Sequence, residues 1–272
     1  MVTLAERRAA LSGELRGYGR VVVAFSGGVD STFLAAIAQE ALGAEAMAIT
    51  GLSPSVAASE RAEAAELAAR IGIRHECVDT HEMENPDYVA NGPMRCFHCK
   101  DELYGILEAI AERAGSTIVV DGTNADDAGD WRPGQQAARE HGVRSPLLEL
   151  GFTKAEIREL SRGMGLPTWD KPAMACLASR IPHGTAVTVE ALDEVGAAEA
   201  LLRGMGLRQV RVRHHGEVAR IETDAAGMAI AFAPENRERV VKKLQGLGFK
   251  HVALDLAGYR SGSMNPSQEQ IS

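Results

Sequence analysis

The residues best suited to bind a phosphate form one turn near the N-terminus, Ser26-Gly27-Gly28-Val29-Asp30-Ser31. The apolar run Val21-Val22-Val23-Ala24 precedes this turn, and a helical pattern from Phe33 follows it. A strand that enters a helix through such a turn leaves backbone N–H groups at the positive end of the helix dipole, where an anion is stabilised. The glycines permit close backbone approach, the serines add hydroxyl donors, and Asp30 could hold a metal or orient the loop. The pattern therefore predicts a phosphate-binding loop, although neither G-x-x-x-x-G-K-[ST] nor G-x-G-x-x-G is present.

Sulfur chemistry is offered by four cysteines, Cys77, Cys96, Cys99 and Cys176. The middle two form a C-x-x-C with a basic residue on either side, and such cations favour thiolate. Taken alone, this pair fits half of a zinc site, a redox pair or part of an iron–sulfur ligand set. A zinc site would also need Cys176 and a histidine such as His98 or His183. Cys77 lies on a predicted strand, where we expect a buried, small apolar side chain.

If the phosphate-binding loop takes ATP, three cysteines together with it permit a specific mechanism. If Cys96, Cys99 and Cys176 bind three irons of a [4Fe–4S] cluster, the fourth iron has no protein ligand and can carry an additional sulfide. ATP would convert a carboxylate into its acyl adenylate, and the sulfide would attack the acyl carbon and release AMP. Without a cluster, Cys176 itself could attack and surrender its sulfur. The cysteines leave both routes open.

Charged residues in the last third of the chain form a second group of candidates. Arg180, Arg211 and Arg213 are candidate ligands of a second phosphate, and the last two share a strand face because side chains alternate along a strand. The alternative for that pair is a solvated strand face. Glu199 and Glu222 are candidate Mg²⁺ ligands beside the same pocket, although scattered carboxylates are usually surface residues.

The elements that must position these residues predict an α/β fold. Continuous apolar runs at about 21–25, 46–50, 73–78 and 117–121 alternate with helical patterns. Apolar runs of this kind indicate a parallel twisted sheet with helices on both faces. Ligands of such sheets lie at the C-terminal ends of the strands. We therefore expect the phosphate loop to lie beside Gly122 and Thr123, which follow the fourth run.

The rest of the chain predicts a second, smaller domain. Residues 121–146 are polar and loop-rich, and a helix at 153–163 begins with a capping box of Thr153 and Glu156. A proline-containing segment around Cys176 predicts the boundary. Beyond it, a small α+β unit with a mostly antiparallel sheet is expected from a helix, two strands, a helix and a strand at 188–203, 207–213, 217–222, 234–246 and 249–255. We predict domains at 1–180, for ATP binding and adenylation, and at 181–272, for substrate binding and assembly.

Composition limits the class of protein. The formal net charge of -8 and the pI near 5.6 argue against a binder of nucleic acid or of anionic membranes, which would carry a basic footprint. No unbroken apolar run has the length of a membrane span, and the first twenty residues contain no apolar signal core. We therefore expect a cytoplasmic enzyme whose cysteines are free, catalytic or metal-bound and not paired in disulfides.

The loop S-G-G-x-D-S resembles the signature of the PP-loop pyrophosphatase superfamily, whose members cleave ATP between the α and β phosphates and adenylate a substrate. This likeness implies the adenine nucleotide alpha hydrolase-like fold. Further segments resemble the LarE family of that superfamily: RCFHCK at 95–100, DGTN at 121–124, WRPG at 131–134, ACLASRIP at 175–182 and GYRSG at 258–262. The resemblance spans nearly the whole chain, and the block around Cys176 is its most specific part.

The resemblance implies an AMP-forming, ATP-dependent sulfurtransferase of nickel-pincer nucleotide biosynthesis. Its substrate would be pyridinium-3,5-biscarboxylic acid mononucleotide, whose carboxylate becomes a thiocarboxylate, with ATP and Mg²⁺ as cofactors. One branch of the family sacrifices the cysteine that matches Cys176, and another holds a cluster on three cysteines. Because Cys96 and Cys99 are also present, the chain resembles the second branch. Arg211 and Arg213 would bind the mononucleotide phosphate, and a homo-oligomer, with a hexamer as the expected form, is implied.

Three other classes stay open from the sequence. A PP-loop enzyme that thiolates tRNA would use similar chemistry, but it would need a broad basic surface that this acidic chain does not predict. An amide-forming ligase of the NAD-synthetase type would have no need of three placed cysteines. An adenylate-sensing module with a structural zinc ion would release neither AMP nor pyrophosphate.

Overall fold

The computed structural model describes residues 3–115, 118–129 and 133–260, which divide into two compact units. Unit 1 comprises Met1–Ser53, Glu60–Glu82 and Cys96–Met174. Unit 2 comprises Pro54–Ser59, Met83–Arg95 and Ala175–Ser272. The division differs from an unbroken first domain that ends at residue 180, because two short early stretches belong to unit 2 and the final change comes at Ala175.

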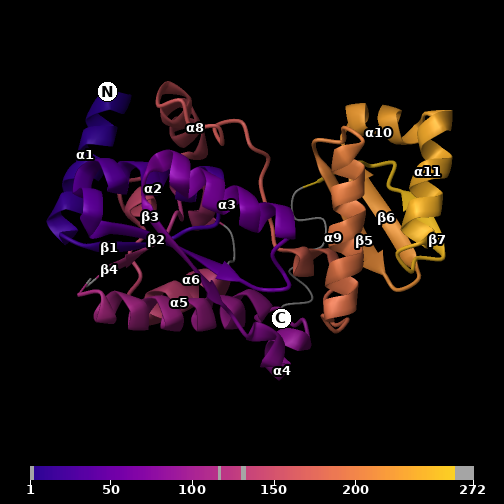
Figure 1. The fold of residues 1–272 in the computed structure, drawn as a ribbon, viewed down its shortest axis with the longest axis horizontal. Helices are drawn as coiled ribbons and strands as arrows, with labels where there is room; N and C mark the ends of the chain where they lie inside the picture. The colour runs from indigo at the N-terminus through magenta and orange to yellow at the C-terminus, as the bar shows by residue number, and fades with distance from the viewer. Residues whose placement is uncertain (1–2, 116–117, 130–132, 261–272) are drawn as a thin grey trace. The chain divides into compact units, whose positions relative to one another are not determined.

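The sheet of unit 1 is parallel and four-stranded, in the order β3-β2-β1-β4 (Figure 1). Its strands are β1 (Val21–Ala24), β2 (Ala46–Leu52), β3 (Arg74–Asp79) and β4 (Ile118–Val120). The central strand β1 pairs with both neighbours, so that Val21 lies opposite Ala46 on one side and Ile118 on the other. The C-terminal ends of β2, β1 and β4 therefore form one edge.

Helices cover both faces of this sheet. The longer ones are α1 (Leu4–Tyr18), α2 (Val29–Leu42), α3 (Ala58–Ile71), α5 (Arg95–Arg113), α6 (Pro133–Glu140) and α8 (Lys154–Gly163). One buried core joins α1, α2, α3 and α8 to the sheet through side chains such as Leu11, Phe33 and Ile157. A second core joins α5 and α6 to the other face through Leu107 and Ala137, and Figure 1 shows α5 opposite α2. The parallel sheet with helices on both faces is confirmed.

Short elements complete unit 1 and its connections: η1 (Gly43–Glu45), η2 (Glu82–Glu84), α4 (Pro86–Val89), η3 (Ala125–Gly129) and α7 (Pro146–Glu149). The prediction of a loop-rich segment over 121–146 is wrong in part, since α6 lies within it. Its buried residues are Pro133, Ala137 and Ala138, and none of them is a large apolar side chain that would mark a core helix. Helix α5 begins at Arg95, which places the C-x-x-C in its first turn.

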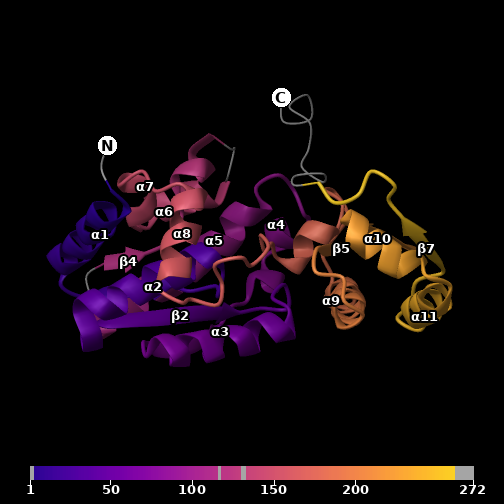
Figure 2. The same ribbon diagram turned by 90° about the horizontal axis from the view of Figure 1, so that it is seen from above.

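Unit 2 contains a three-stranded sheet in the order β5-β6-β7, with strands β5 (Val210–His215), β6 (Val218–Thr223) and β7 (His251–Leu254). Its helices are η4 (Leu177–Arg180), α9 (Val189–Gly204), α10 (Ala225–Phe232) and α11 (Pro234–Gln245). A core that includes Leu202, Val212 and Leu244 packs α9 and α11 against the strands, on the same side of the sheet (Figure 2).

The prediction of a mostly antiparallel sheet in unit 2 is wrong for one of its two strand pairs. The pair β5–β6 is antiparallel, but β6 and β7 run parallel. A parallel pair needs a long crossover, and α10 and α11 provide it. The helix α10, AAGMAIAF, is apolar all round, so the amphipathic pattern that would reveal it is missing. In the described part of the chain, no helix combines the length and the hydropathy that crossing a membrane requires.

Candidate active site

The predicted phosphate loop joins β1 to α2 and is closed by its own serines. The Oγ atoms of Ser26 and Ser31 lie 3.1 Å apart, and the backbone N–H of Gly28 donates to Ser26 Oγ over 3.4 Å. Gly27 has a φ of 67°, a left-handed conformation that favours glycine. The first N–H groups of a helix have no partner within it. The loop therefore presents the donors of the first turn of α2 in a preformed turn.

Gly122, from the loop after β4, lies directly against the start of α2. A Cβ atom at this position would lie 2.8 Å from the backbone nitrogen of Ser31 and 3.1 Å from the carbonyl carbon of Asp30. Only glycine permits this approach, because real Cβ atoms do not come so near to backbone. The structure thus brings Gly122 to the phosphate loop, as expected from the C-terminal ends of parallel strands.

Thr123 is positioned by the carboxylate of Asp121, which directly follows β4. Asp121 accepts hydrogen bonds from the Thr123 backbone N–H (3.1 Å) and hydroxyl (2.9 Å), from Ser145 Oγ (2.7 Å) and from the hydroxyl of Tyr104 on α5 (2.8 Å). Burial, together with the neighbouring Asp121, raises the pKa of Tyr104 well above its usual value. Tyr104 therefore stays a hydrogen-bond donor, and it joins α5 to the phosphate edge.

Two lysines contact the phosphate loop although they follow it by more than 120 residues in the sequence. Lys154, the first residue of α8, forms an ion pair with Asp30 through its Nζ. Lys171 donates from Nζ to the carbonyl of Gly27 (3.0 Å) and pairs with Glu63 (2.8 Å). Neither lysine is predicted from the sequence. The capping box marks the start of α8, but no local pattern links that start to a loop more than a hundred residues earlier.

Asp30 has the features of a magnesium ligand. Its Oδ1 is buried and has no hydrogen-bond partner among the described residues. Burial raises the pKa of Asp30 more than the nearby Lys154 lowers it, and the carboxylate of Asp127 raises it further. Carboxylate oxygens are the ligands that Mg²⁺ prefers. Asp30, with Asp127 nearby, is therefore the best metal candidate in unit 1.

In unit 2, Arg180 organises the loop that carries Cys176. The guanidinium of Arg180 is almost fully buried, at 1% exposed. Its Nη1 donates to the carbonyls of Ala175 and Cys176 and to the hydroxyl of Ser179, the last two over 2.9 Å. Its Nε and Nη2 donate to the two carboxylate oxygens of Glu199 over 2.8 and 3.0 Å. The backbone of Cys176 is thus fixed by a buried, bidentate ion pair.

The two strand arginines lie in the same unit as this loop and are buried. Arg213 donates to the carbonyl of Ser179 (3.1 Å) and to Glu222 (2.7 Å). Arg211 lies over the ring of Tyr259, with its Cζ 5.4 Å from the ring centroid. Burial and the positive charge of Arg180 both lower the pKa of Arg211. The predicted alternative of a solvated strand face is therefore wrong, and three buried cations gather in unit 2.

Glu199 and Glu222, the predicted magnesium ligands, contact arginines in the structure. Glu199 is fully buried and also accepts from Arg203 (2.7 Å) and from the backbone N–H of Val212 (3.1 Å). Burial raises the pKa of Glu199, but the surrounding arginines outweigh it and hold this pKa below its usual value. Glu222 pairs with Arg213 and with Arg220. Their role as metal ligands stays a prediction.

A second hub holds the Cys176 loop from the other side. Asn91, fully buried at a φ of 56°, donates through Nδ2 to the carbonyls of Ile181 (3.3 Å), Pro182 (2.9 Å) and Thr185 (2.9 Å). Arg95 donates to Asn91 Oδ1 and to the carbonyl of Ala178 (2.9 Å). The sequence does not predict this role of Asn91, because its partners lie about 90 positions away. Arg95, which immediately precedes Cys96, is therefore held by contacts within unit 2.

Comparison with known proteins shows the family of the chain. The model of the asparagine synthase family matches residues 8–127, which include the phosphate loop. An uncharacterized protein of Synechocystis sp. (strain ATCC 27184 / PCC 6803 / Kazusa) is 48% identical over 90% of this chain and 92% of its own length. Pyridinium-3,5-bisthiocarboxylic acid mononucleotide synthase of Lactiplantibacillus plantarum is 38% identical over 97% of this chain and 96% of its own length. The chain belongs to the LarE family.

The predicted PP-loop ancestry and the prediction of an enzyme, an ATP-dependent sulfurtransferase, are thereby confirmed. Similarity to enzymes that thiolate tRNA is narrower. A tRNA-specific 2-thiouridylase of Synechococcus sp. (strain JA-2-3B'a(2-13)) is 30% identical over 56% of this chain and 50% of its own length.

The cysteines of this LarE-family chain lie on both units. Cys96 is exposed and Cys99 half-buried in the first turn of α5, where a spacing of three places both on one helix face. Cys176 is half-buried and directly precedes η4 in unit 2. None of the four cysteines is in a disulfide, but Cys77 is exposed, so its predicted burial is wrong. It lies on β3, an edge strand of the sheet.

In neither unit do the described residues complete a metal-binding group. Among the described residues, no three His, Cys, Asp or Glu side chains cluster as ligands. Of the three predicted cluster ligands, Cys96 and Cys99 belong to unit 1 and Cys176 belongs to unit 2. The cluster therefore stays a prediction.

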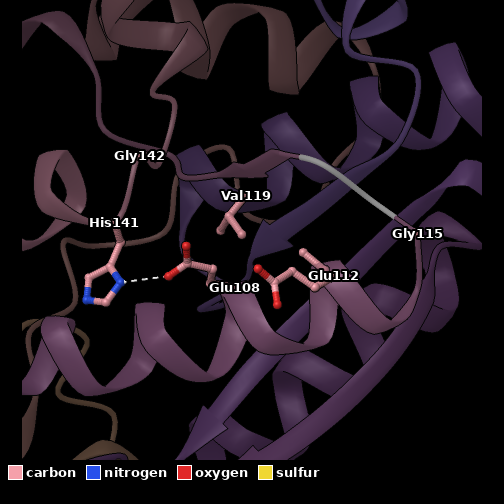
Figure 3. A pocket seen from close by; sticks show the side chains of 7 residues that line it. Glu108, Glu112, Gly115, Val119, His141 and Gly142 are labelled. Carbon is pink, nitrogen blue, oxygen red and sulfur yellow. Dashed lines mark hydrogen bonds and ion pairs between the residues drawn. The ribbon is translucent and has the colours of Figure 1, made fainter.

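Unit 1 also contains a pocket of about 430 Å³ that holds none of the predicted site residues (Figure 3). Its lining includes Glu108, Glu112 and His141, and His141 hydrogen-bonds to Glu108 (3.1 Å) and to Asp101 (3.0 Å). Although burial opposes it, these two carboxylates raise the pKa of His141. The pocket lies toward the C-terminal end of α5, whereas the cysteines occupy the first turn of that helix. We therefore assign it no part in the LarE chemistry.

Proposed function

We propose that this protein adenylates a carboxylate of pyridinium-3,5-biscarboxylic acid mononucleotide with ATP and then inserts sulfur to form a thiocarboxylate. The observation that carries the proposal is the Cys176 loop, whose carbonyls are held by a buried arginine beside two further buried arginines. A sulfur-bearing residue next to buried cations suits an anionic substrate that must accept sulfur. The similarity to a bisthiocarboxylic acid mononucleotide synthase over nearly the full chain supports the same substrate.

Unit 1 would carry out the activation. The N–H groups of the loop at Ser26–Ser31 would bind the phosphates of ATP, with Gly122 and Thr123 beside them. Asp30 and Asp127 would hold Mg²⁺, which supplies positive charge to the phosphates when it is bound. The substrate carboxylate attacks the α phosphorus, its new O–P bond forms as the bond to pyrophosphate breaks, and an acyl adenylate results. Lys171, bonded to the Gly27 carbonyl, fixes the loop for this step.

Unit 2 would bind the substrate and present the sulfur. Arg211 and Arg213 would bind the mononucleotide phosphate, since arginine suits phosphate geometry. Glu222 orients Arg213, and Glu199 orients Arg180, which in turn fixes the backbone of Cys176. In the second step, sulfur attacks the acyl carbon, the C–S bond forms, and the bond to the AMP oxygen breaks. The arginines keep the substrate in place between the two steps.

We propose that the sulfur comes from a cluster held by Cys96, Cys99 and Cys176. Such a [4Fe–4S] cluster would supply a sulfide bound to the iron that has no protein ligand. The i, i+3 spacing of the first two thiols on one helix turn suits two ligands of a common group. Arg95 supports Cys176 as the third ligand. It directly precedes Cys96 in the chain and donates to the carbonyl of Ala178, two residues beyond Cys176. The alternative is cleavage of the Cβ–Sγ bond of Cys176, which would leave dehydroalanine.

Anaerobic purification separates these routes. We expect iron and sulfide in stoichiometric amounts and an unchanged protein mass after turnover with ATP and substrate. Protein without iron that loses the elements of H₂S from Cys176 would instead establish the sacrificial route. Zinc alone would contradict both and favour a structural metal.

The second candidate function is tRNA thiolation, which the partial similarity to a 2-thiouridylase favours. The net charge of -8 opposes it, because affinity for nucleic acid depends mainly on phosphate contacts by basic residues. We expect no shift of tRNA in a gel assay at physiological salt. A tight complex there would overturn the pyridinium substrate.

We also propose a cytoplasmic homo-oligomer, with a hexamer as the expected form. Phe232 at the end of α10 and Leu256 after β7 are 54% and 82% exposed, and exposed apolar surface of this kind supports contact with a further copy. Light scattering should give the mass of an oligomer, and a monomer at micromolar concentration would contradict the proposal.

A further inference from the structure

Lys154 is held by its backbone, while its side chain reaches the phosphate loop. Its backbone N–H donates to Asp126 Oδ2 over 2.8 Å, and it follows the N-cap Thr153, whose capping box with Glu156 is complete. Its side chain is 34% exposed and ends in the ion pair with Asp30. The start of α8 is therefore fixed, but the ammonium group sits on a long, flexible stem with solvent beside it.

The second lysine of the loop, Lys171, is held differently. Its Nζ bridges the carbonyl of Gly27 and the carboxylate of Glu63, and only 15% of the side chain is exposed. Two partners of different kinds hold that ammonium in place. The ammonium of Lys154 has one partner among the described residues, the carboxylate of Asp30. Of the two lysines, Lys154 is thus the one that can exchange its partner.

Asp30 has an unmet requirement for positive charge. One of its oxygens pairs with Lys154, and the other is buried with no hydrogen-bond partner in the described part of the chain. The carboxylate of Asp127 adds negative charge nearby. Among the described residues, the Lys154 ammonium is therefore the only cation paired with this carboxylate, at a place that suits a divalent cation.

We propose that Lys154 is a stand-in cation, which neutralises Asp30 in the nucleotide-free enzyme, yields this carboxylate to Mg²⁺ and then moves to the phosphates of ATP. The inference rests on the proposed use of ATP and deepens it. Adenylation releases pyrophosphate, and an ammonium aimed at the leaving group stabilises the charge that develops there. Lys154 would thus serve the folded, empty site and the reaction in turn.

Binding of α,β-methylene-ATP with Mn²⁺ tests the exchange without any sulfur transfer. For Lys154→Met, calorimetry should show about fivefold weaker binding of this analogue, which corresponds to about 1 kcal/mol for a partly exposed charge contact. The Mn²⁺ concentration at half-saturation, followed by electron paramagnetic resonance, should fall by about threefold to fivefold, because no ammonium competes for Asp30. The two affinities must therefore change in opposite directions.

Matched variants separate exchange from a fixed contact. Lys171→Met should weaken the analogue but leave the Mn²⁺ half-saturation as in wild type. Lys154→Arg keeps the charge and should keep Mn²⁺ half-saturation within twofold of wild type. Lys250→Met, from an exposed pair with Glu217, should change neither value. Thermal melting of each variant would confirm that it is folded.

Two results would count against the inference. An unchanged or raised Mn²⁺ half-saturation in folded Lys154→Met would overturn the exchange alone and leave the proposed function standing. Wild-type protein that binds no analogue at all would overturn the proposed function, and the exchange with it.

Discussion

The phosphate loop of unit 1 and the Cys176 loop of unit 2 are stabilised in opposite ways. The first is closed by short contacts between neighbours in sequence, such as the Ser26–Ser31 hydroxyl pair, and by a glycine that lets another loop approach. The second is held by buried side-chain charges, chiefly Arg180 and Glu199. The carboxylates show the same contrast, because the pKa of Asp30 is raised and that of Glu199 is lowered.

This difference shows which loop is prepared for a ligand. Burial disfavours the charged form of Asp30 more than the ion pair with Lys154 favours it. A further cation would therefore stabilise the carboxylate. Glu199 already has three charged or N–H partners that satisfy it. In unit 1, the buried charge of Asp30 would be stabilised by an incoming metal ion. In unit 2, the carboxylates already hold arginines and, through Arg180, the backbone of Cys176.

The largest effect should come from breaking the ion pair of unit 2. Glu199→Gln leaves Arg180 with a neutral partner in a buried site, and loss of one partner of such a pair destabilises by about 3–5 kcal/mol. Urea unfolding measures this loss. The matched control is Glu217→Gln, from an exposed pair, which should change stability by about 0.5 kcal/mol or less. A loss below about 1 kcal/mol for Glu199→Gln would contradict the contrast between the loops.

The corresponding change in unit 1 is Gly122→Ala. The added methyl group would meet the backbone of α2 at 2.8 Å, and overpacking of this kind destabilises by about 1–3 kcal/mol. We expect ATP–pyrophosphate exchange to be lost as the loop shifts. Gly13→Ala in α1, where a Cβ meets nothing within 4 Å, should be neutral or stabilising by about 0.5–1 kcal/mol. Normal exchange by Gly122→Ala would show that the close approach is not needed.

A smaller effect is expected where one donor is removed from a carboxylate that keeps others. Tyr104→Phe deletes the hydrogen bond to Asp121, which retains Ser145 and Thr123, so we expect a loss of about 1 kcal/mol. Chemical unfolding and the KM for ATP would report it. If neither the stability nor the KM for ATP changed, Tyr104 would have no part in positioning Asp121 at the phosphate loop.

The smallest effect lies in the pH dependence, and it has opposite signs in the two loops. The folded-state pKa of Glu199 is lowered, so its contribution is present above the unfolded pKa, near 4.5, and is lost as pH falls through the lower folded value. The pKa of Asp30 is raised, so its ionisation opposes folding as pH rises from the unfolded value, near 3.8, through the folded one.

Stability curves of two variants would reveal these signs. The deficit of Glu199→Gln relative to wild type should shrink in acid. Asp30→Asn should be more stable than wild type at pH 7, with a gain that shrinks in acid. A gain for Asp30→Asn that grows toward low pH would contradict the assigned direction.

The sequence predicts best what local patterns determine. The turn at Ser26–Ser31 and the capping box at Thr153 depend on neighbours in the chain, and the parallel strands follow from continuous apolar runs. The pairing of Lys154 with Asp30, 124 positions apart, leaves no local trace. The same holds for Asn91 and its carbonyl partners, and for the edge position of β3 that exposes Cys77. The sequence pattern does not predict helix α10, because this helix has no polar face.

The measurement that tests the account most directly is sulfur transfer by Cys176→Ser. This variant keeps the phosphate loop of unit 1 and the arginines of unit 2, so we predict substrate-dependent ATP–pyrophosphate exchange at the wild-type rate. Mass spectrometry should find the acyl adenylate or its hydrolysis product and no thiocarboxylate. Thiocarboxylate formed by Cys176→Ser at the wild-type rate would contradict a two-part site in which one unit activates and the other delivers sulfur.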